Sequence, residues 1–173
     1  ISLKELKSER DKNFLLKLKN KPLYVIKISN PAESISLLKL QDFVLKSLIK
    51  RNSVKNFIPK KIHSTIKVYQ DQLNRDCYVR VLRFIEGKMY AVVNHNNNLE
   101  QSLGTLLGNL SKELQNLNHP NAFRKFEWDP SNISWIEKEI NFFKGNNKKI
   151  IKNNLHEYNY FIKKNLKNLR FSL

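Results

Sequence analysis

The order of hydrophobic and polar residues predicts strands in the first half of the chain. Apolar and polar positions alternate over short runs that polar turns separate, which is typical of half-buried strands. We expect five strands, at residues 1–6, 13–18, 23–28, 65–69 and 77–84. The first three should form an antiparallel meander, because the connections between them are short.

A helical pattern lies between the third and fourth expected strands. Residues 31–51 carry apolar side chains at three- and four-residue spacing, so one broad face should be buried. Asn30 suits the N-cap, Pro31 the first helical position and Glu33 a capping box. Five strands with one inserted helix predict an α+β lobe for residues 1–93.

The second half of the chain has the pattern of helices. A leucine stripe at helical spacing begins at Leu99, and two more helices are expected at residues 133–143 and 148–169. We place the boundary between the sheet lobe and this helical region, residues 94–173, at the polar stretch 94–98.

Composition places the chain among globular proteins. It has 173 residues, 40% of them hydrophobic, and its apolar runs are too short to span a membrane. The single cysteine, Cys77, excludes an internal disulfide, so we expect a cytoplasmic protein without a membrane partner. A net charge of +17 suggests a polyanionic partner, but the basic residues are spread through every segment together with asparagines. We therefore favour solvated lysines and do not expect nucleic acid as the partner.

Lys27 is the first candidate for chemistry. It lies in the apolar run 24–28, in the third expected strand and ahead of the inserted helix. In protein kinases, a lysine on the third strand of the N-lobe holds the α and β phosphates of ATP. A buried unpaired ammonium is costly, whereas a triphosphate and an acid from the helix can compensate its charge. The alternative is an edge strand whose lysine points to solvent.

Three stretches resemble a known family in their order along the chain. They are Ser8–Phe14, Tyr24–Pro31 and Val79–Gly87, and the similarity continues in order through residues 103–108, 118–120 and 126–129, and weakly beyond Asp129. They look like the landmarks of the aminoglycoside phosphotransferase-like kinases. Within that superfamily the chain is most similar to hydroxylysine kinase and its bacterial relatives, some of which are fused to a class III aminotransferase.

The resemblance implies ATP-dependent phosphorylation of a hydroxyl group on a small amine or amino acid, with Mg²⁺ as the metal. The implied cofactor-binding residues are Lys27, Ser8, Asp11, Asn13, Val25, Arg83, Phe84 and Ile85. Lys27 would bind the phosphates, and the turn at residues 8–13 would cover them although it lacks glycine. Residues 83–85 would be the hinge that contacts adenine, with Val25 against a face of the base.

The resemblance also implies an acidic partner for Lys27 on the inserted helix, and here the sequence departs from the family. The helix has no glutamate beyond Glu33, and Gln41 and Asp42 stand at the corresponding place. The resemblance favours Gln41, because the family members carry glutamine near this point, and it would orient Lys27 by a hydrogen bond without neutralising it. Asp42 is the other cofactor-site candidate, or else a solvated helix residue.

In the family, a His-Gly-Asp catalytic loop and a metal-binding aspartate follow a helix like the one expected at residues 148–169. The chain contains no His-Gly-Asp, so we expect a kinase-like N-lobe and first C-lobe helices, truncated before the catalytic loop. Catalytic residues and Mg²⁺ ligands would then lie beyond Leu173, and the chain alone would be inactive. The acceptor would be hydroxylysine-like or aminoglycoside-like.

Two alternatives stay open at this point. The non-glycine turn and the missing helix glutamate favour a degenerate kinase-like module that binds without catalysis. The charge of +17 alone favours a basic nucleic-acid-binding protein, whose affinity would fall steeply with salt.

Overall fold

A computed structural model describes residues 1–123, 129, 131 and 133–168 of the chain. The chain packs into two compact units, residues 1–122 and 123–172. The predicted lobes, residues 1–93 and 94–173, were divided at the polar stretch 94–98, and this division stays a prediction.

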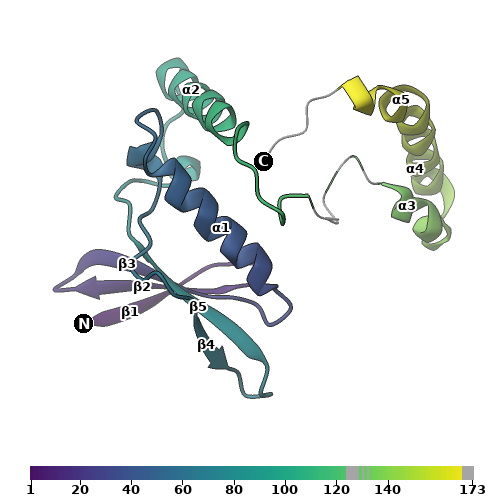
Figure 1. The fold of residues 1–173 in the computed structure, drawn as a ribbon. Coiled ribbons are helices and arrows are strands. Elements are labelled where there is room, and N and C mark those ends of the chain that lie inside the picture. Colours follow the sequence, from purple (N-terminus) through teal and green to yellow (C-terminus); the bar gives the residue numbers. More distant parts are fainter. Residues whose placement is uncertain (124–128, 130, 132, 169–173) are drawn as a thin grey trace. The chain divides into compact units, whose positions relative to one another are not determined.

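The first unit is built on a five-stranded antiparallel sheet with the order β1-β2-β3-β5-β4. Its strands are β1 (Ser2–Leu6), β2 (Lys12–Leu18), β3 (Lys21–Ile28), β4 (Lys67–Gln70) and β5 (Asp76–Arg83). All five predicted strands are therefore confirmed, with ends shifted by a few residues. The third strand is central rather than an edge strand, as Figure 1 shows, so the edge-strand alternative for Lys27 is wrong.

Two turns of the sheet need left-handed backbone. Lys19 and Asn20 join β2 to β3 with φ of 47° and 64°, and Asn74 adopts φ 55° between β4 and β5. Positive φ at both residues of a two-residue loop matches the right-handed twist of the flanking strands. These polar turns fix the register that places each strand residue on its face of the sheet.

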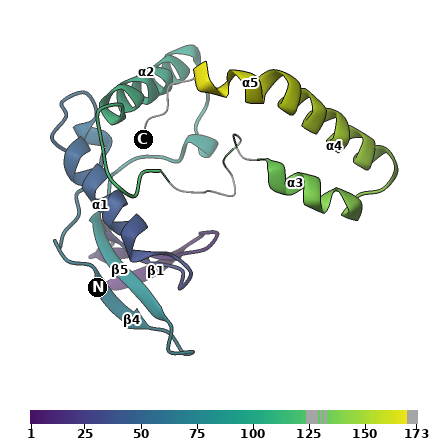
Figure 2. The same ribbon diagram turned by 45° about the vertical axis from the view of Figure 1, so that its right-hand side comes forward.

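Helix α1 (Ile35–Leu48) lies over one face of the sheet in both views (Figures 1 and 2). The predicted N-cap, Asn30, is wrong: the side chain of Ser34 caps α1 and accepts the N–H of Leu37 at 3.2 Å. Asn30 instead forms an Asx turn, in which its Oδ1 accepts the N–H of Ala32 at 2.8 Å. That turn delays the helix, which also ends at Leu48 rather than at residue 51.

The core of the first unit lies between α1 and the sheet. Leu38 of α1 and Val54 after it are each 1% exposed. Leu15 of β2 and Leu37, Leu40 and Leu48 of α1 are also buried, whereas the buried Cys77 is three residues from Arg80 on β5 and projects to the other face of the sheet. The apolar face that the sequence predicted for α1 is therefore the buried one.

Helix α2 (Asn97–Leu114) completes the first unit and confirms the helix predicted from Leu99. It follows the short helices η1 (Lys55–Phe57) and η2 (Tyr90–Val92), and Asn96 caps it by accepting the N–H of Leu99 at 2.9 Å. Glu113 ties its end to the loop after α1, because its carboxylate accepts the Ser53 hydroxyl at 2.7 Å. No residue of α2 is buried, although every residue of this helix is described.

The second unit is helical, as predicted. Its elements are α3 (Ser134–Glu139), η3 (Ile140–Phe142), α4 (Gly145–Glu157), the π-helical turn η4 (Tyr158–Ile162), α5 (Lys163–Asn165) and η5 (Leu166–Asn168). Gly145 has φ +55° where α4 begins, so glycine suits this start. Tyr158 is buried and donates its hydroxyl to the carbonyl of Ser131 at 2.6 Å. Residues 169–173 of the last predicted helix and its continuation lie outside the described residues.

Within the described ranges, no helix combines the length and the apolar character that crossing a membrane would require.

Candidate functional site

Lys27 has polar neighbours on both adjoining strands. In the register of the sheet, Asn13 of β2 and Arg80 of β5 stand directly opposite it. Residues that stand opposite each other in antiparallel strands project to the same face. The sheet therefore lines up an amide, an ammonium and a guanidinium group across its three middle strands.

The Lys27 ammonium is held from the β2 side. Its Nζ donates to Oδ1 of Asn13 at 3.0 Å and lies 3.9 Å from Oδ2 of Asp11. The side chains of Lys27 and Asp11 are 28% and 27% exposed. A half-buried ammonium with a carboxylate and an amide beside it avoids the cost of an unpaired charge and still faces solvent.

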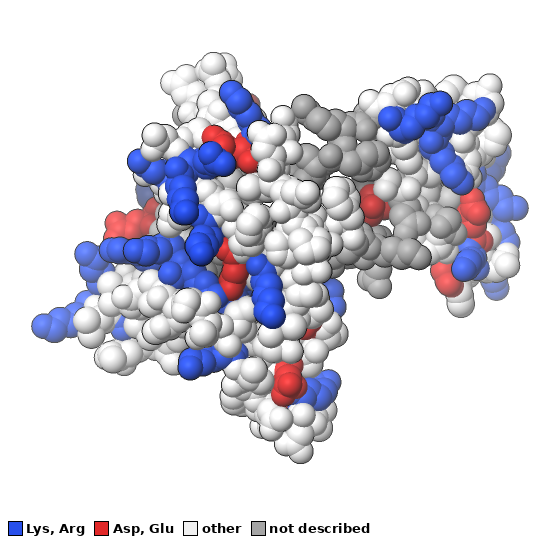
Figure 3. Space-filling view, viewed as in Figure 1, with Lys and Arg blue, Asp and Glu red and all other residues white. Residues whose placement is uncertain are grey.

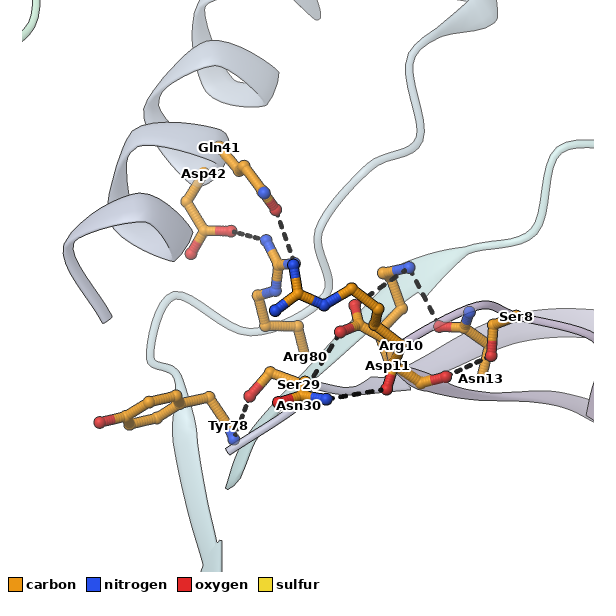
Figure 4. A network of polar contacts seen from close by, with 11 residues as sticks. Ser8, Arg10, Asp11, Asn13, Ser29, Asn30, Gln41, Asp42, Tyr78 and Arg80 are labelled. Carbon is orange, nitrogen blue, oxygen red and sulfur yellow. Dashed lines mark hydrogen bonds and ion pairs between the residues drawn. The ribbon is translucent and has the colours of Figure 1, made fainter. Parts of the chain in front are cut away.

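The turn between β1 and β2 is tied to the segment after β3. Asp11 accepts the backbone N–H of Asn30 through Oδ1 at 3.1 Å, and its other oxygen faces Lys27. The Ser8 hydroxyl donates to the Asp11 carbonyl, and the Asn30 side chain reaches the carbonyl of Arg10 at 3.5 Å. Figure 4 shows these residues gathered at the end of the strands. The structure thus brings Asp11 and Asn13 to Lys27, and Ser8 to the backbone of Asp11.

Gln41 and Asp42 have a different partner from the one predicted. Both reach from α1 to Arg80, whose Nη2 donates to Oε1 of Gln41 at 2.8 Å and whose Nη1 lies 3.4 Å from Oδ1 of Asp42 (Figure 4). The prediction that Gln41 orients Lys27 is corrected accordingly. Asp42 is also not a solvated residue, since its second oxygen accepts Nζ of Lys61.

The residues joined by these contacts form one polar cluster, made of Asp11, Asn13, Lys27, Asn30, Gln41, Asp42, Lys61 and Arg80. Sequence reasoning missed three of them, Arg80, Lys61 and Asn30. Arg80 is a cation between two valines on a strand, which is the same signal that identified Lys27. Lys61 carries no such signal, because it lies in a loop that only the fold brings to α1. Asn30 was assigned to the helix cap, which concealed its contact with Asp11.

The predicted hinge begins where β5 ends. The backbone N–H of Arg83 donates to the carbonyl of Lys60 at 2.8 Å, and that of Phe84 donates to the carbonyl of Leu23 at 2.9 Å. Ile85 is 42% exposed. Val25 is half-buried and lies two residues before Lys27, so both project to the same face of β3. The roles of Val25 and of residues 83–85 toward adenine stay predictions.

In the described part of the chain, no three His, Cys, Asp or Glu side chains are grouped so that they could hold a metal ion. The prediction that Mg²⁺ ligands lie beyond Leu173 concerns residues outside the chain and stays a prediction.

One solved structure identifies the fold. No family model and no curated protein matches the chain. The chain is similar to the amicoumacin kinase hAmiN solved in complex with AMP-PNP, Ca²⁺ and Ami, with a TM-score of 0.67 and 16% sequence identity. The match covers 98% of this chain and 49% of that one, so the chain spans about half the length of the kinase. The five-stranded sheet with its helix is therefore a kinase-like N-lobe, and the predicted fold class is confirmed.

Proposed function

We propose that this chain supplies the nucleotide-binding lobe of an ATP-dependent kinase that phosphorylates a hydroxyl group on a small amine or amino acid. The observation that carries the proposal is the place of Lys27. It projects from the central strand of a kinase-like lobe and remains 28% exposed. The structure with the similar fold was solved with AMP-PNP, which adds support for a nucleotide.

The surroundings of Lys27 fit a phosphate ligand. At a separation of about 4 Å, two unit charges near a protein surface attract by on the order of 4 kcal/mol before desolvation and screening are subtracted. Asp11 offers one carboxylate at this distance, whereas a triphosphate offers several negative oxygens. ATP would therefore displace Asp11 from Lys27, and Asn13 would continue to orient the ammonium. Mg²⁺ would neutralise part of the phosphate charge when it is bound.

Asp11 also gives weight to the second candidate, a degenerate kinase-like module that binds without catalysis. The turn that would cover the phosphates has no glycine, and its carboxylate already faces Lys27. Both features would weaken nucleotide binding. The two candidates differ in one measurable property, because only a kinase transfers the γ-phosphate in the complete protein.

The charge distribution does not favour a nucleic-acid-binding protein. On the face seen in Figure 3, Lys and Arg side chains are distributed over both units with acidic side chains among them. A dedicated nucleic-acid site usually gathers its basic residues on one face or along one helix. We therefore keep phosphotransfer as the proposed function.

The nucleotide site is tested by calorimetric titration of the chain with Mg²⁺-ATP. Lys27→Met keeps the length of the side chain and removes its charge, so the affinity should fall by about tenfold or more, as expected for the loss of a charged hydrogen bond. Lys21→Met is the matched control, because Lys21 is an exposed lysine at the start of the same strand. Equal affinities for the wild type and Lys27→Met would contradict the assignment.

The acceptor and the complete architecture need a separate test. We propose a hydroxylysine-like or aminoglycoside-like acceptor in the cytoplasm, and an aminotransferase fused in a longer protein. Reading the coding DNA past Leu173 should reveal a His-Gly-Asp loop, a downstream asparagine and a later aspartate. ATP consumption by the complete protein with each acceptor class would then separate a kinase from a binding module.

A further inference from the structure

Lys27 was expected to contact both a side chain of the inserted helix and a phosphate ligand. In the structure, Arg80 on the neighbouring strand makes the contact with the helix. We propose that Arg80, rather than Lys27, is the positioning residue that holds α1 against the sheet, and that this leaves the Lys27 ammonium to an anionic ligand. The part of this proposal that concerns the ligand rests on the proposed function. The part that concerns α1 stands on the contacts of Arg80 alone.

Arg80 is built into the interface between α1 and the sheet. Its side chain is 4% exposed, and it donates to Gln41 at 2.8 Å and lies 3.4 Å from Asp42. A planar guanidinium with several fixed donors suits two acceptors on one helix turn, whereas an ammonium is a single point charge. Lys61 bonds the other oxygen of Asp42, so the loop before β4 is joined to the same cluster.

Lys27 takes its partners from another part of the lobe. Among the described residues, its hydrogen bond is to Asn13 and its ion pair is to Asp11, and both lie at the start of β2 or in the turn before it. Neither partner belongs to α1. Movement of Lys27 toward a ligand would thus break contacts with the β1–β2 turn and leave the contacts of α1 intact.

The charges of the cluster favour an anion. Its ion pairs join three cations, Lys27, Lys61 and Arg80, to two carboxylates, Asp11 and Asp42. Gln41 supplies a hydrogen-bond acceptor to Arg80 without a negative charge. A glutamate at position 41 would make the same contact and balance the cluster, so the neutral amide preserves one positive charge for the ligand.

The positioning role is tested by hydrogen exchange of the α1 amides in the absence of nucleotide. Arg80→Lys and Gln41→Ala should each lower protection in α1 by about tenfold, while Lys27→Met should leave it unchanged, since hydrogen bonds to a buried charge are the ones lost. The amides of β2 and β3 serve as the internal reference. Loosening of α1 by Lys27→Met, or full protection in both Arg80→Lys and Gln41→Ala, would overturn the proposal.

Gln41→Glu separates charge from structure. This variant keeps an acceptor for Arg80, so protection of α1 should stay at the wild-type level or rise. The affinity for Mg²⁺-ATP should nevertheless fall severalfold, because the added carboxylate neutralises the cluster. A purely structural Gln41 would predict unchanged affinity, and that result would overturn the electrostatic part.

The two proposals fail in different ways. If the wild-type chain binds no nucleotide, the proposed function fails, yet the exchange measurements still decide whether Arg80 holds α1. If Arg80→Lys does not fold, Gln41→Ala gives the decision, since it removes one acceptor and leaves every charge in place.

Discussion

Lys27 and Arg80 face the same side of the sheet as direct cross-strand neighbours, and they differ in what covers them. Helix α1 lies over Arg80, whose side chain is 4% exposed and bonded to two residues of the helix. Lys27 is 28% exposed, is bonded to Asn13 at the start of β2 and is paired with Asp11 in the β1–β2 turn. Burial and contact partners, rather than the residue type or the strand pattern, therefore distinguish the two cations.

The difference in burial between Arg80 and Lys27 predicts different contributions to the free energy of unfolding. A buried charge that loses its partner remains without water to solvate it, whereas a half-exposed charge regains water. Removal of Arg80 also leaves the side-chain oxygen of Gln41 without its donor, while Asp42 keeps Lys61. Stability should therefore depend strongly on Arg80 and weakly on Lys27, although ligand binding should show the reverse order.

Arg80→Met gives the largest expected loss of stability. Breaking a buried ion pair costs about 3–5 kcal/mol, and we expect the lower end because Asp42 keeps its contact with Lys61. Lys27→Met is the matched comparison on the neighbouring strand and should cost less than about 1 kcal/mol, as partly exposed ion pairs do. Urea unfolding of both variants measures the two values. Equal losses in the two variants would remove the distinction between the cations.

Much of the fold follows from local pattern. Alternation of apolar residues identified all five strands, and three- and four-residue spacing identified the buried face of α1. The start of α1 was misplaced because Asn30 and Ser34 are both good N-caps, and local preference does not rank them. The Asx turn at Asn30, which its contact with Asp11 supports, decided the outcome.

Only part of the candidate site could be predicted, because its contacts depend on how α1 packs against the sheet. Lys27 could be singled out because an ion in an apolar run is unusual, whereas the residues of the β1–β2 turn were named from the family resemblance. The partner of Gln41 could not be found in this way. Position 41 fixes which face of the helix the amide occupies, whereas the choice between Lys27 and Arg80 depends on how α1 is set over the strands.

Ser34→Ala should give an intermediate loss of stability, because it weakens the start of α1, the helix that covers Arg80. The substitution removes the acceptor for the Leu37 N–H, and loss of an N-cap costs about 1 kcal/mol. Ser34→Asn should retain most of the stability, because asparagine caps equally well. Thermal unfolding followed by circular dichroism compares them. Unchanged stability in Ser34→Ala would mean that the Ser34 hydroxyl does not cap α1.

The smallest effect is expected in the β4–β5 turn, whose ion pair contacts neither Lys27 nor Arg80. Two hydrogen bonds from Arg75 hold the pKa of Asp71 below its ordinary value. The first and larger cause is the bond from the side-chain Nε at 2.9 Å, and the second is the bond from the backbone N–H. A lowered carboxyl pKa stabilises the folded state above the pKa of the unfolded chain, and this contribution is lost as the pH falls through the folded value.

Asp71→Asn tests whether the contribution of Asp71 to stability is lost as the pH falls. The wild type should be the more stable protein at neutral pH, and the difference should shrink as the pH falls below about 4, where aspartate is protonated in the unfolded chain. Urea unfolding at several pH values measures the difference, and Asp76→Asn on the neighbouring strand provides the control. Because Arg75 is 57% exposed, solvent screens the pair, and the effect should stay below those of Arg80 and Ser34. A difference that widens in acid would mean that the turn is held by contacts other than this ion pair.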